Sequence, residues 1–92
     1  MHSKVDLHIH SNFSDGDDSI ETIIDKCNKL NLEIISITDH DSCEAYLAKN
    51  KIILDKFRGK IIKGIELTVY YKGSIIEILC YNFDVDEMNK IV

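Results

Sequence analysis

The sequence lacks several features that define large classes of protein. It has no proline and no tryptophan, only four glycines, and no basic excess, because its formal net charge is −5. Without a basic patch to neutralise a run of phosphates, the chain is not expected to form a general nucleic-acid surface. No stretch approaches the roughly 18 consecutive apolar residues of a membrane span, and no signal-like apolar segment opens the chain. We therefore expect a cytoplasmic protein without membrane contact.

A disulfide framework is not indicated either. The three cysteines, Cys27, Cys43 and Cys80, are odd in number and have no C-x-x-C spacing. Each lies within an apolar pattern, which favours a buried reduced thiol over a metal ligand. The chain does contain 45% hydrophobic and 29% charged residues over 92 positions, without an internal repeat, a low-complexity segment or a linker. This composition predicts one small globular domain over residues 1–92.

Hydrophobic periodicity predicts an α/β order of elements. The expected elements are, in chain order, a strand over residues 4–10, a helix over 19–30, a strand over 33–38, a helix over 42–57 and two strands over 60–71 and 74–83. Asp18 or Ser19 is expected to cap the first helix, and Arg58-Gly59 to end the second. Residues 84–92 begin with two candidate caps, Asp84 and Asp86, and are expected to be too few to complete a helix. Strand, helix, strand, helix is the order of βα units.

The last two strands are expected to form a hairpin. The connection Lys72-Gly73 is typical of a tight two-residue turn. Such a turn would place Glu66 opposite Leu79 and Thr68 opposite Glu77, so that the two glutamates share one face as diagonal neighbours. A loop one residue longer would send the two carboxylates to opposite faces.

The first strand carries a pattern of metal-ligand side chains. Successive side chains of a strand point to opposite faces, so Asp6, His8 and His10 are predicted to project together, opposite an apolar face. Two imidazoles two residues apart can meet one cation, and Asp15 follows where the chain can turn back. A lone buried histidine is usually a core hydrogen-bonding residue, but this pair beside a carboxylate favours a divalent metal site. His2, at the terminus, is not expected to take part.

Further polar residues follow the other predicted strands. His40 comes directly after the second strand, and Glu66 and Glu77 lie on the hairpin. The carboxyl ends of parallel strands form one rim, so we expect these residues to join the histidines of the first strand. Imidazoles and carboxylates suit zinc, manganese or iron, and two or three such ions can clamp a phosphate and activate a water molecule. Of the acids beside His40, Asp39 is predicted to orient an imidazole and Asp41 to cap the next helix.

In order and spacing, these motifs resemble the first segments of the PHP (polymerase and histidinol phosphatase) family of metal-dependent phosphoesterases. The motifs are Asp6-Leu-His-Ile-His-Ser-x-x-Ser-Asp-Gly, Ile37-Thr-Asp-His-Asp, Gly64-Ile-Glu and Glu77-Ile-Leu-Cys-Tyr-Asn-Phe-Asp. The resemblance implies the first part of a distorted (β/α)7 barrel, in which a βαβα arrangement is followed by a β-hairpin.

The resemblance also implies a ligand set of two or three divalent ions. His8 and His10 would bind one metal ion, and Glu66 would bridge two. Asp15 and His40 would hold a third. In the similar branch of the family that acts on nucleoside phosphates and short oligonucleotides, the last motif usually has His where this chain has Glu77, and this carboxylate could ligate in place of that imidazole.

The implied activity is hydrolysis of a small phosphomonoester or nucleotide by metal-activated water, with Glu66, His40 and Asp39 as catalytic residues. Complete family members are much longer, and their remaining ligands have no counterpart in this sequence. The chain is then a fragment of a longer protein, a natural remnant, or a protein that completes its site as a homo-oligomer. The alternative to an enzyme is a non-catalytic metal-binding or oligomerising remnant.

Overall fold

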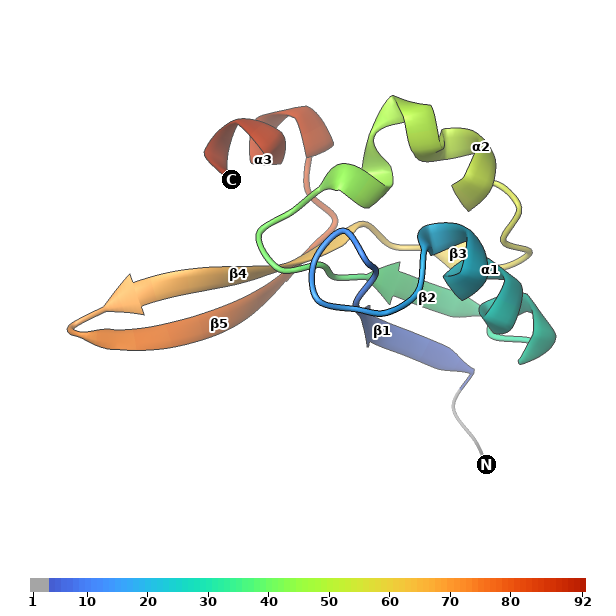
Figure 1. Ribbon diagram of the computed structural model, residues 1–92, viewed down its shortest axis with the longest axis horizontal. Coiled ribbons are helices and arrows are strands. Elements are labelled where there is room, and N and C mark those ends of the chain that lie inside the picture. The colour runs from blue at the N-terminus through green and yellow to red at the C-terminus, as the bar shows by residue number, and fades with distance from the viewer. Residues whose placement is uncertain (1–3) are drawn as a thin grey trace.

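The computed structural model describes residues 4–92 and contains two small sheets, of which the first is covered by helices (Figure 1). The expectation for His2 lies outside the described residues. The first sheet is parallel, with strand order β1, β2, β3, and the second is an antiparallel hairpin of β4 and β5. The strands are β1 (Val5–Ile9), β2 (Ile34–Ile37), β3 (Lys60–Ile61), β4 (Gly64–Tyr71) and β5 (Ser74–Tyr81). The hairpin projects away from the parallel sheet (Figure 1).

The first helix, α1 (Ile20–Lys29), forms where the apolar periodicity predicts it. Its N-cap is Ser19, whose hydroxyl accepts a hydrogen bond from the backbone N–H of Thr22 at 3.2 Å. The buried face of α1 consists of Ile20, Ile23, Ile24 and Cys27. This face packs on β2, where Ile35 and Ile37 are 0% exposed. Full burial of one such side chain contributes about 1.5–3 kcal/mol, so the core lies between α1 and β2.

The predicted second helix over residues 42–57 is wrong, because the segment divides into three short turns. These are the 3₁₀ turns η1 (Glu44–Tyr46) and η2 (Ala48–Asn50) and the helix α2 (Lys51–Leu54). Leu47 separates the first two with an extended backbone, φ −66° and ψ 153°. The Tyr46 hydroxyl donates to the carbonyl oxygen of Ile37 at 2.5 Å and accepts from the Ile37 N–H at 3.0 Å. This contact with β2 holds Tyr46 in place and overrides the helical period.

Asp41 does not cap a helix, contrary to the prediction. Its φ of 48° lies in the left-handed region, so the chain turns sharply after β2. The Asp41 carboxylate accepts a hydrogen bond from the backbone N–H of Thr68 at 2.9 Å. The side chain therefore ties the end of β2 to β4.

The predicted single strand over residues 60–71 is divided between the two sheets. β3 pairs in parallel with β2, whereas β4 pairs with β5. Gly64 begins β4 at a close approach, because a Cβ atom there would lie 2.2 Å from Ser36 Oγ and 2.6 Å from Thr38 Cγ2. Only glycine leaves β4 enough room to pass this close to β2.

The hairpin has the predicted register. Lys72 and Gly73 form its turn with φ values of 49° and 79°, as expected of a two-residue turn with positive φ at both positions. Glu66 lies opposite Leu79, and Thr68 lies opposite Glu77. The diagonal placement of the two glutamates is therefore confirmed.

Two smaller expectations are corrected. Residues after the hairpin do complete a helix, α3 (Val85–Ile91), because the Asp84 carboxylate accepts a hydrogen bond from the Glu87 N–H at 3.0 Å and caps it. Cys27 and Cys43 are buried free thiols, and burial raises the pKa of both, but the free thiol Cys80 is only half-buried.

Candidate metal centre

Strand β1 brings two histidines to the site but does not bring Asp6 with them. In the pairing of β1 with β2, Asp6 lies beside Ile35 and Ile9 lies beside Ile37. Three positions along β1 thus match two along β2, a register shift of the kind made by a β-bulge, which interrupts strict alternation of side chains. The Asp6 carboxylate accepts a hydrogen bond from the backbone N–H of His8 at 3.2 Å. Among residues 4–92, Asp6 belongs to none of the groups of side chains that could hold a metal ion.

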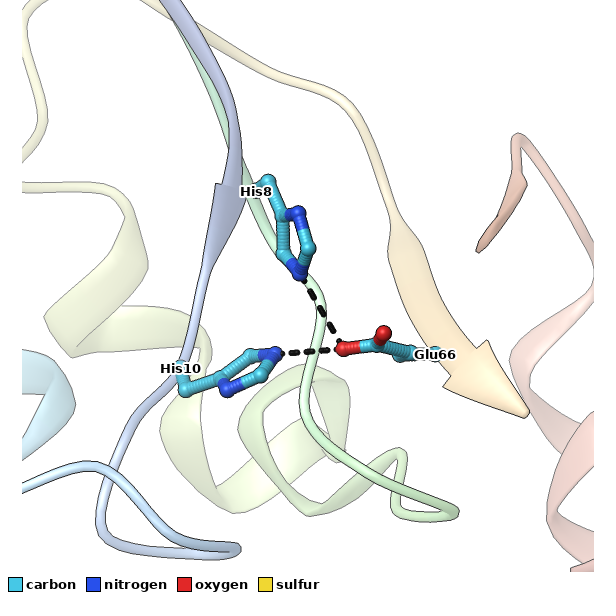
Figure 2. Close-up of side chains that lie close together, drawn as sticks. All are labelled: His8, His10 and Glu66. Carbon is cyan, nitrogen blue, oxygen red and sulfur yellow. Dashed lines mark hydrogen bonds and ion pairs between the residues drawn. The ribbon is translucent and has the colours of Figure 1, made fainter. Parts of the chain in front are cut away.

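His8 of β1 and His10, directly after β1, both point toward Glu66 (Figure 2). Its Oε1 lies 3.1 Å from His8 Nε2 and 2.7 Å from His10 Nε2. The glutamate is only 7% exposed. Burial alone would raise the pKa of the Glu66 carboxyl, but hydrogen bonds with His8, His10 and Glu77 and the charge of His40 hold that pKa below its ordinary value. A buried carboxylate among imidazoles is the result.

The main chain holds Glu66 in this position. A parallel bridge pairs His40 with Glu66 beyond the end of β2. The Glu66 N–H donates to the carbonyl oxygen of Asp39, and the Asp41 N–H donates to the carbonyl oxygen of Glu66, both at 3.0 Å. The start of β4 is thereby attached to the rim formed by the ends of β1 and β2.

Asp15 reaches the same rim from the loop between β1 and α1. Its Oδ1 lies 2.8 Å from His10 Nδ1, and its Oδ2 lies 3.2 Å from His40 Nε2. His10 therefore contacts Glu66 through one ring nitrogen and Asp15 through the other. The rings of His10 and His40 lie 4.4 Å apart between centroids. Asp15 thus lies between two imidazoles that come from different strand ends.

Glu77 approaches from β5 and is one of the three more exposed members of the cluster, with His8 and Asp15. Its Oε1 lies 4.0 Å from His40 Nδ1, and its side chain is 49% exposed. The distance is at the limit of an ion pair. His40 thus has three carboxylate neighbours: Asp15 and Glu66 face its Nε2, and Glu77 faces its Nδ1.

The six predicted ligands fall into three overlapping groups, in each of which the ligand atoms lie within 4.8 Å of one another. The groups are His8–His10–Glu66, His10–Asp15–His40 and His40–Glu66–Glu77. Each combines imidazole nitrogen with carboxylate oxygen, a donor set that suits zinc, manganese or iron. His10, His40 and Glu66 each belong to two groups. The donors present therefore fit a cluster of divalent ions with shared ligands.

Asp39 was predicted to orient an imidazole, but its carboxylate instead bonds to the loop that carries Asp15. Its carboxylate accepts hydrogen bonds from the backbone N–H and hydroxyl of Ser11 and from the hydroxyl of Ser14. The sequence analysis missed both serines. Their spacing, Ser-x-x-Ser directly after a strand, is the signal that could have indicated a polar loop anchor.

Among residues 4–92, no helix is long and apolar enough to cross a membrane.

Comparison with known proteins identifies a family match over most of the chain. The PHP domain family matches residues 6–91. The chain is 29% identical over 76 residues to a phosphoribosyl 1,2-cyclic phosphate 1,2-diphosphodiesterase of Eggerthella lenta, covering 80% of the chain and 29% of that protein. It is 30% identical over 88 residues to a 5'-3' exoribonuclease of Haemophilus influenzae, covering 91% of the chain and 30% of that protein.

Two solved structures share the fold. One is an amidohydrolase from Chromobacterium violaceum with bound sulfate and no metal, with a TM-score of 0.79 and 24% identity over 89% of this chain and 28% of that one. The other is a proposed metal-dependent phosphoesterase from Bifidobacterium adolescentis, with a TM-score of 0.79 and 23% identity over 94% of this chain and 30% of that one. The chain spans 28–30% of the length of these four proteins.

Proposed function

Because this chain belongs to the PHP domain family, we propose that it carries part of the metal centre of a phosphoester hydrolase. The observation that carries the proposal is the double contact of His10, whose Nε2 lies 2.7 Å from Glu66 and whose Nδ1 lies 2.8 Å from Asp15. One imidazole thus joins two groups of ligand atoms. Because a neutral imidazole has one unprotonated nitrogen, His10 can bind one ion and donate to the carboxylate beside the next, which suits ions bound side by side in a phosphoester hydrolase.

Each ligand has a distinct position in this proposal. His8 and His10 hold one cation together with Glu66, and Glu66 also faces the group that contains Glu77. Asp15 and His40 hold a further cation. When bound, manganese, zinc or iron would activate a water molecule and offset the negative charge of the phosphoryl oxygens.

Contacts within the cluster and beyond it would keep the ligands in place. The buried Glu66 carboxylate keeps His8 and His10 oriented before any substrate enters. Asp39 acts through the loop that it holds. We propose a small phosphomonoester or nucleotide as the substrate. The names of the two relatives given above, a cyclic phosphate diphosphodiesterase and an exoribonuclease, both describe enzymes that act on phosphate esters.

The proposed fold is the first part of a distorted (β/α)7 barrel. β1, α1, β2 and the turns after β2 make up its first βα units, and β4 and β5 continue it as a hairpin. A complete site would take further ligands from other segments or from a second copy of the chain. The non-catalytic alternative is an oligomerising remnant, which is favoured by the exposed apolar side chains of the hairpin, among them Tyr70 at 76% and Ile75 at 64%.

The deciding experiment combines metal analysis with turnover. The purified chain, of known oligomeric state, is freed of metal with a chelator, reloaded with manganese, zinc or iron, and assayed with p-nitrophenyl phosphate and bis-p-nitrophenyl phosphate. We expect a stoichiometric divalent ion and metal-dependent release of p-nitrophenol. His8→Ala should lower the metal content and the Tm together, because a bound ion stabilises only the folded state.

The control is Asp17→Asn, a change on an exposed residue of the loop that carries Asp15. It should leave metal content and turnover as in the wild type. If the chain binds a stoichiometric ion but releases no p-nitrophenol with manganese, zinc or iron, the hydrolase proposal is overturned and the non-catalytic alternative is supported. Unchanged metal content in His8→Ala would overturn the assignment of β1 as a source of ligands.

A further inference from the structure

Asp39 is a buried carboxylate that makes three hydrogen bonds. It is 1% exposed, and it accepts from the Ser11 N–H at 2.6 Å, the Ser11 hydroxyl at 2.7 Å and the Ser14 hydroxyl at 2.7 Å. Burial of a carboxylate is costly unless such partners are present. Both oxygens are occupied by these donors, so the carboxylate is committed to the loop that follows β1.

The donors belong to the loop that carries Asp15. The carbonyl oxygen of Ser11 accepts from the N–H of Ser14 at 3.1 Å and from the N–H of Gly16 at 3.0 Å, which folds the loop back on itself. Gly16 passes so close to the strand that a Cβ atom there would lie 2.2 Å from the carbonyl oxygen of His10. The loop thus returns to the end of β1 and presents Asp15 to the imidazoles.

Asp15 needs this support because burial does not hold its side chain. The Asp15 side chain is 63% exposed, and its contacts among the described residues are the two imidazoles of His10 and His40. A carboxylate this exposed pays a large entropic cost to remain in one place unless its backbone is already held. Among residues 4–92, Asp39 is the acidic side chain that anchors that backbone.

We infer that Asp39 is the positioning residue of Asp15, and that it determines how tightly the group His10–Asp15–His40 binds its cation. The inference rests on the proposed function, since it concerns one cation of that metal centre. The Asp39 side chain has no such effect on Glu66, because the Glu66 N–H donates to the main-chain carbonyl of Asp39. A side-chain change at Asp39 therefore weakens one group and spares His8–His10–Glu66.

The test is a titration of the metal-free full chain with Mn²⁺, and separately with Zn²⁺, by isothermal calorimetry. In Asp39→Asn the amide nitrogen cannot accept from the donor that faces it, and the remaining oxygen no longer carries a negative charge, so the loop is held less firmly. We expect one cation to bind about 10- to 100-fold more weakly, the usual effect of losing a partner that orients a ligand. The other cation should bind as in the wild type. Asp17→Asn, which removes one negative charge from the loop that carries Asp15, should leave both affinities unchanged.

A double-mutant cycle separates positioning from general destabilisation. Asp15→Asn should weaken the same cation, and adding Asp39→Asn to it should cause no further loss. If Asp39→Asn does not fold, Ser14→Ala tests the same contact and should weaken the same cation, whereas Ser14→Thr keeps the hydroxyl and should restore its affinity.

Three results would overturn the inference while leaving the proposed function intact: unchanged affinities in Asp39→Asn and Ser14→Ala, equal weakening of both cations, or an additional loss in the Asp15→Asn background. A wild-type chain that binds neither Mn²⁺ nor Zn²⁺ would refute the metal centre and this inference together.

Discussion

Replacing Glu66 by glutamine should separate the structural and metal-binding roles of the cluster. The substitution keeps the volume of the side chain but removes its negative charge. In the metal-free protein, the substitution mainly removes the charge-assisted hydrogen bond between Glu66 and His10. This bond is 2.7 Å long, and the Glu66 side chain is only 9% exposed. Such a bond contributes about 1.5–3 kcal/mol. The 3.1 Å contact with His8 should add little, because the His8 side chain is 51% exposed and screened by water.

The effect in the presence of metal should be larger, because Glu66 belongs to two of the three ligand groups. A cation at 100 times its Kd stabilises the wild type by about 2.7 kcal/mol, which raises the Tm by about 11–22 °C for a domain of this size. If Glu66→Gln weakens the affinity about 100-fold, the same cation concentration stabilises by about 0.4 kcal/mol, or about 2–3 °C.

The assay is thermal unfolding followed by circular dichroism, with chelator and with Mn²⁺ or Zn²⁺. The matched control is Glu87→Gln, because Glu87 is 73% exposed and pairs only loosely with Lys90 at 3.4 Å. The control should keep the metal-induced rise of the wild type. If the metal raises the Tm of Glu66→Gln as much as that of the wild type, the view that this carboxylate connects the ligand groups is refuted.

Three further predictions concern neighbouring parts of the molecule. Burial raises the pKa of Tyr46 from 10.0 to about 12, so the neutral hydroxyl stabilises the fold fully below pH 10 and this contribution is lost as the pH rises through 12. The loss is about 3 kcal/mol for a shift of this size, and chemical denaturation of Tyr46→Phe across this range should lack that portion of the pH dependence. Gly64→Ala should lower the unfolding free energy by about 1–3 kcal/mol in urea titrations, because the new Cβ would lie 2.2 Å from the oxygen of the buried Ser36; an unchanged midpoint would contradict the close approach. Glu77→Gln should change the unfolding free energy without metal by less than about 0.5 kcal/mol, since the side chain is 49% exposed, yet lower the number or affinity of bound cations measured by calorimetry; identical binding isotherms would remove Glu77 from the ligand set.

The elements that depend on local chemistry could be predicted from the sequence. Helix α1 has both a capping serine and one continuous apolar face, so local and tertiary preferences agree. The hairpin register followed from Lys72-Gly73, because a two-residue turn permits only one pairing of the strands. Residues 42–57 also have helical periodicity, but there Tyr46 bonds to the backbone of β2 and Leu47 is extended. Periodicity cannot reveal a partner that lies elsewhere in the fold.

In the candidate site, too, some residues could be predicted from the sequence and some contacts could not. Residue type and strand position were enough to choose His8, His10, Asp15, His40, Glu66 and Glu77, because imidazoles and carboxylates at strand ends have few inexpensive structural roles. The sequence could not predict the partners of Asp39, since its carboxylate could serve a histidine or a loop equally well. Ser11 and Ser14 were missed because a polar loop residue shows its contact only after the loop has folded back.

By itself, the sequence determined which side chains could bind a metal ion and which strands carry them, because alternation, spacing and turn length are local properties of the chain. Only the tertiary structure decided which of those side chains meet. His10 and Glu66 are 56 residues apart in sequence, and the main-chain bridge beside His40 brings them to 2.7 Å. Asp6 is in none of the ligand groups found among residues 4–92, and the loop that carries Asp15 is bonded to the buried Asp39. Distances between remote residues depend on packing and on the accumulated geometry of the backbone, which no local pattern contains.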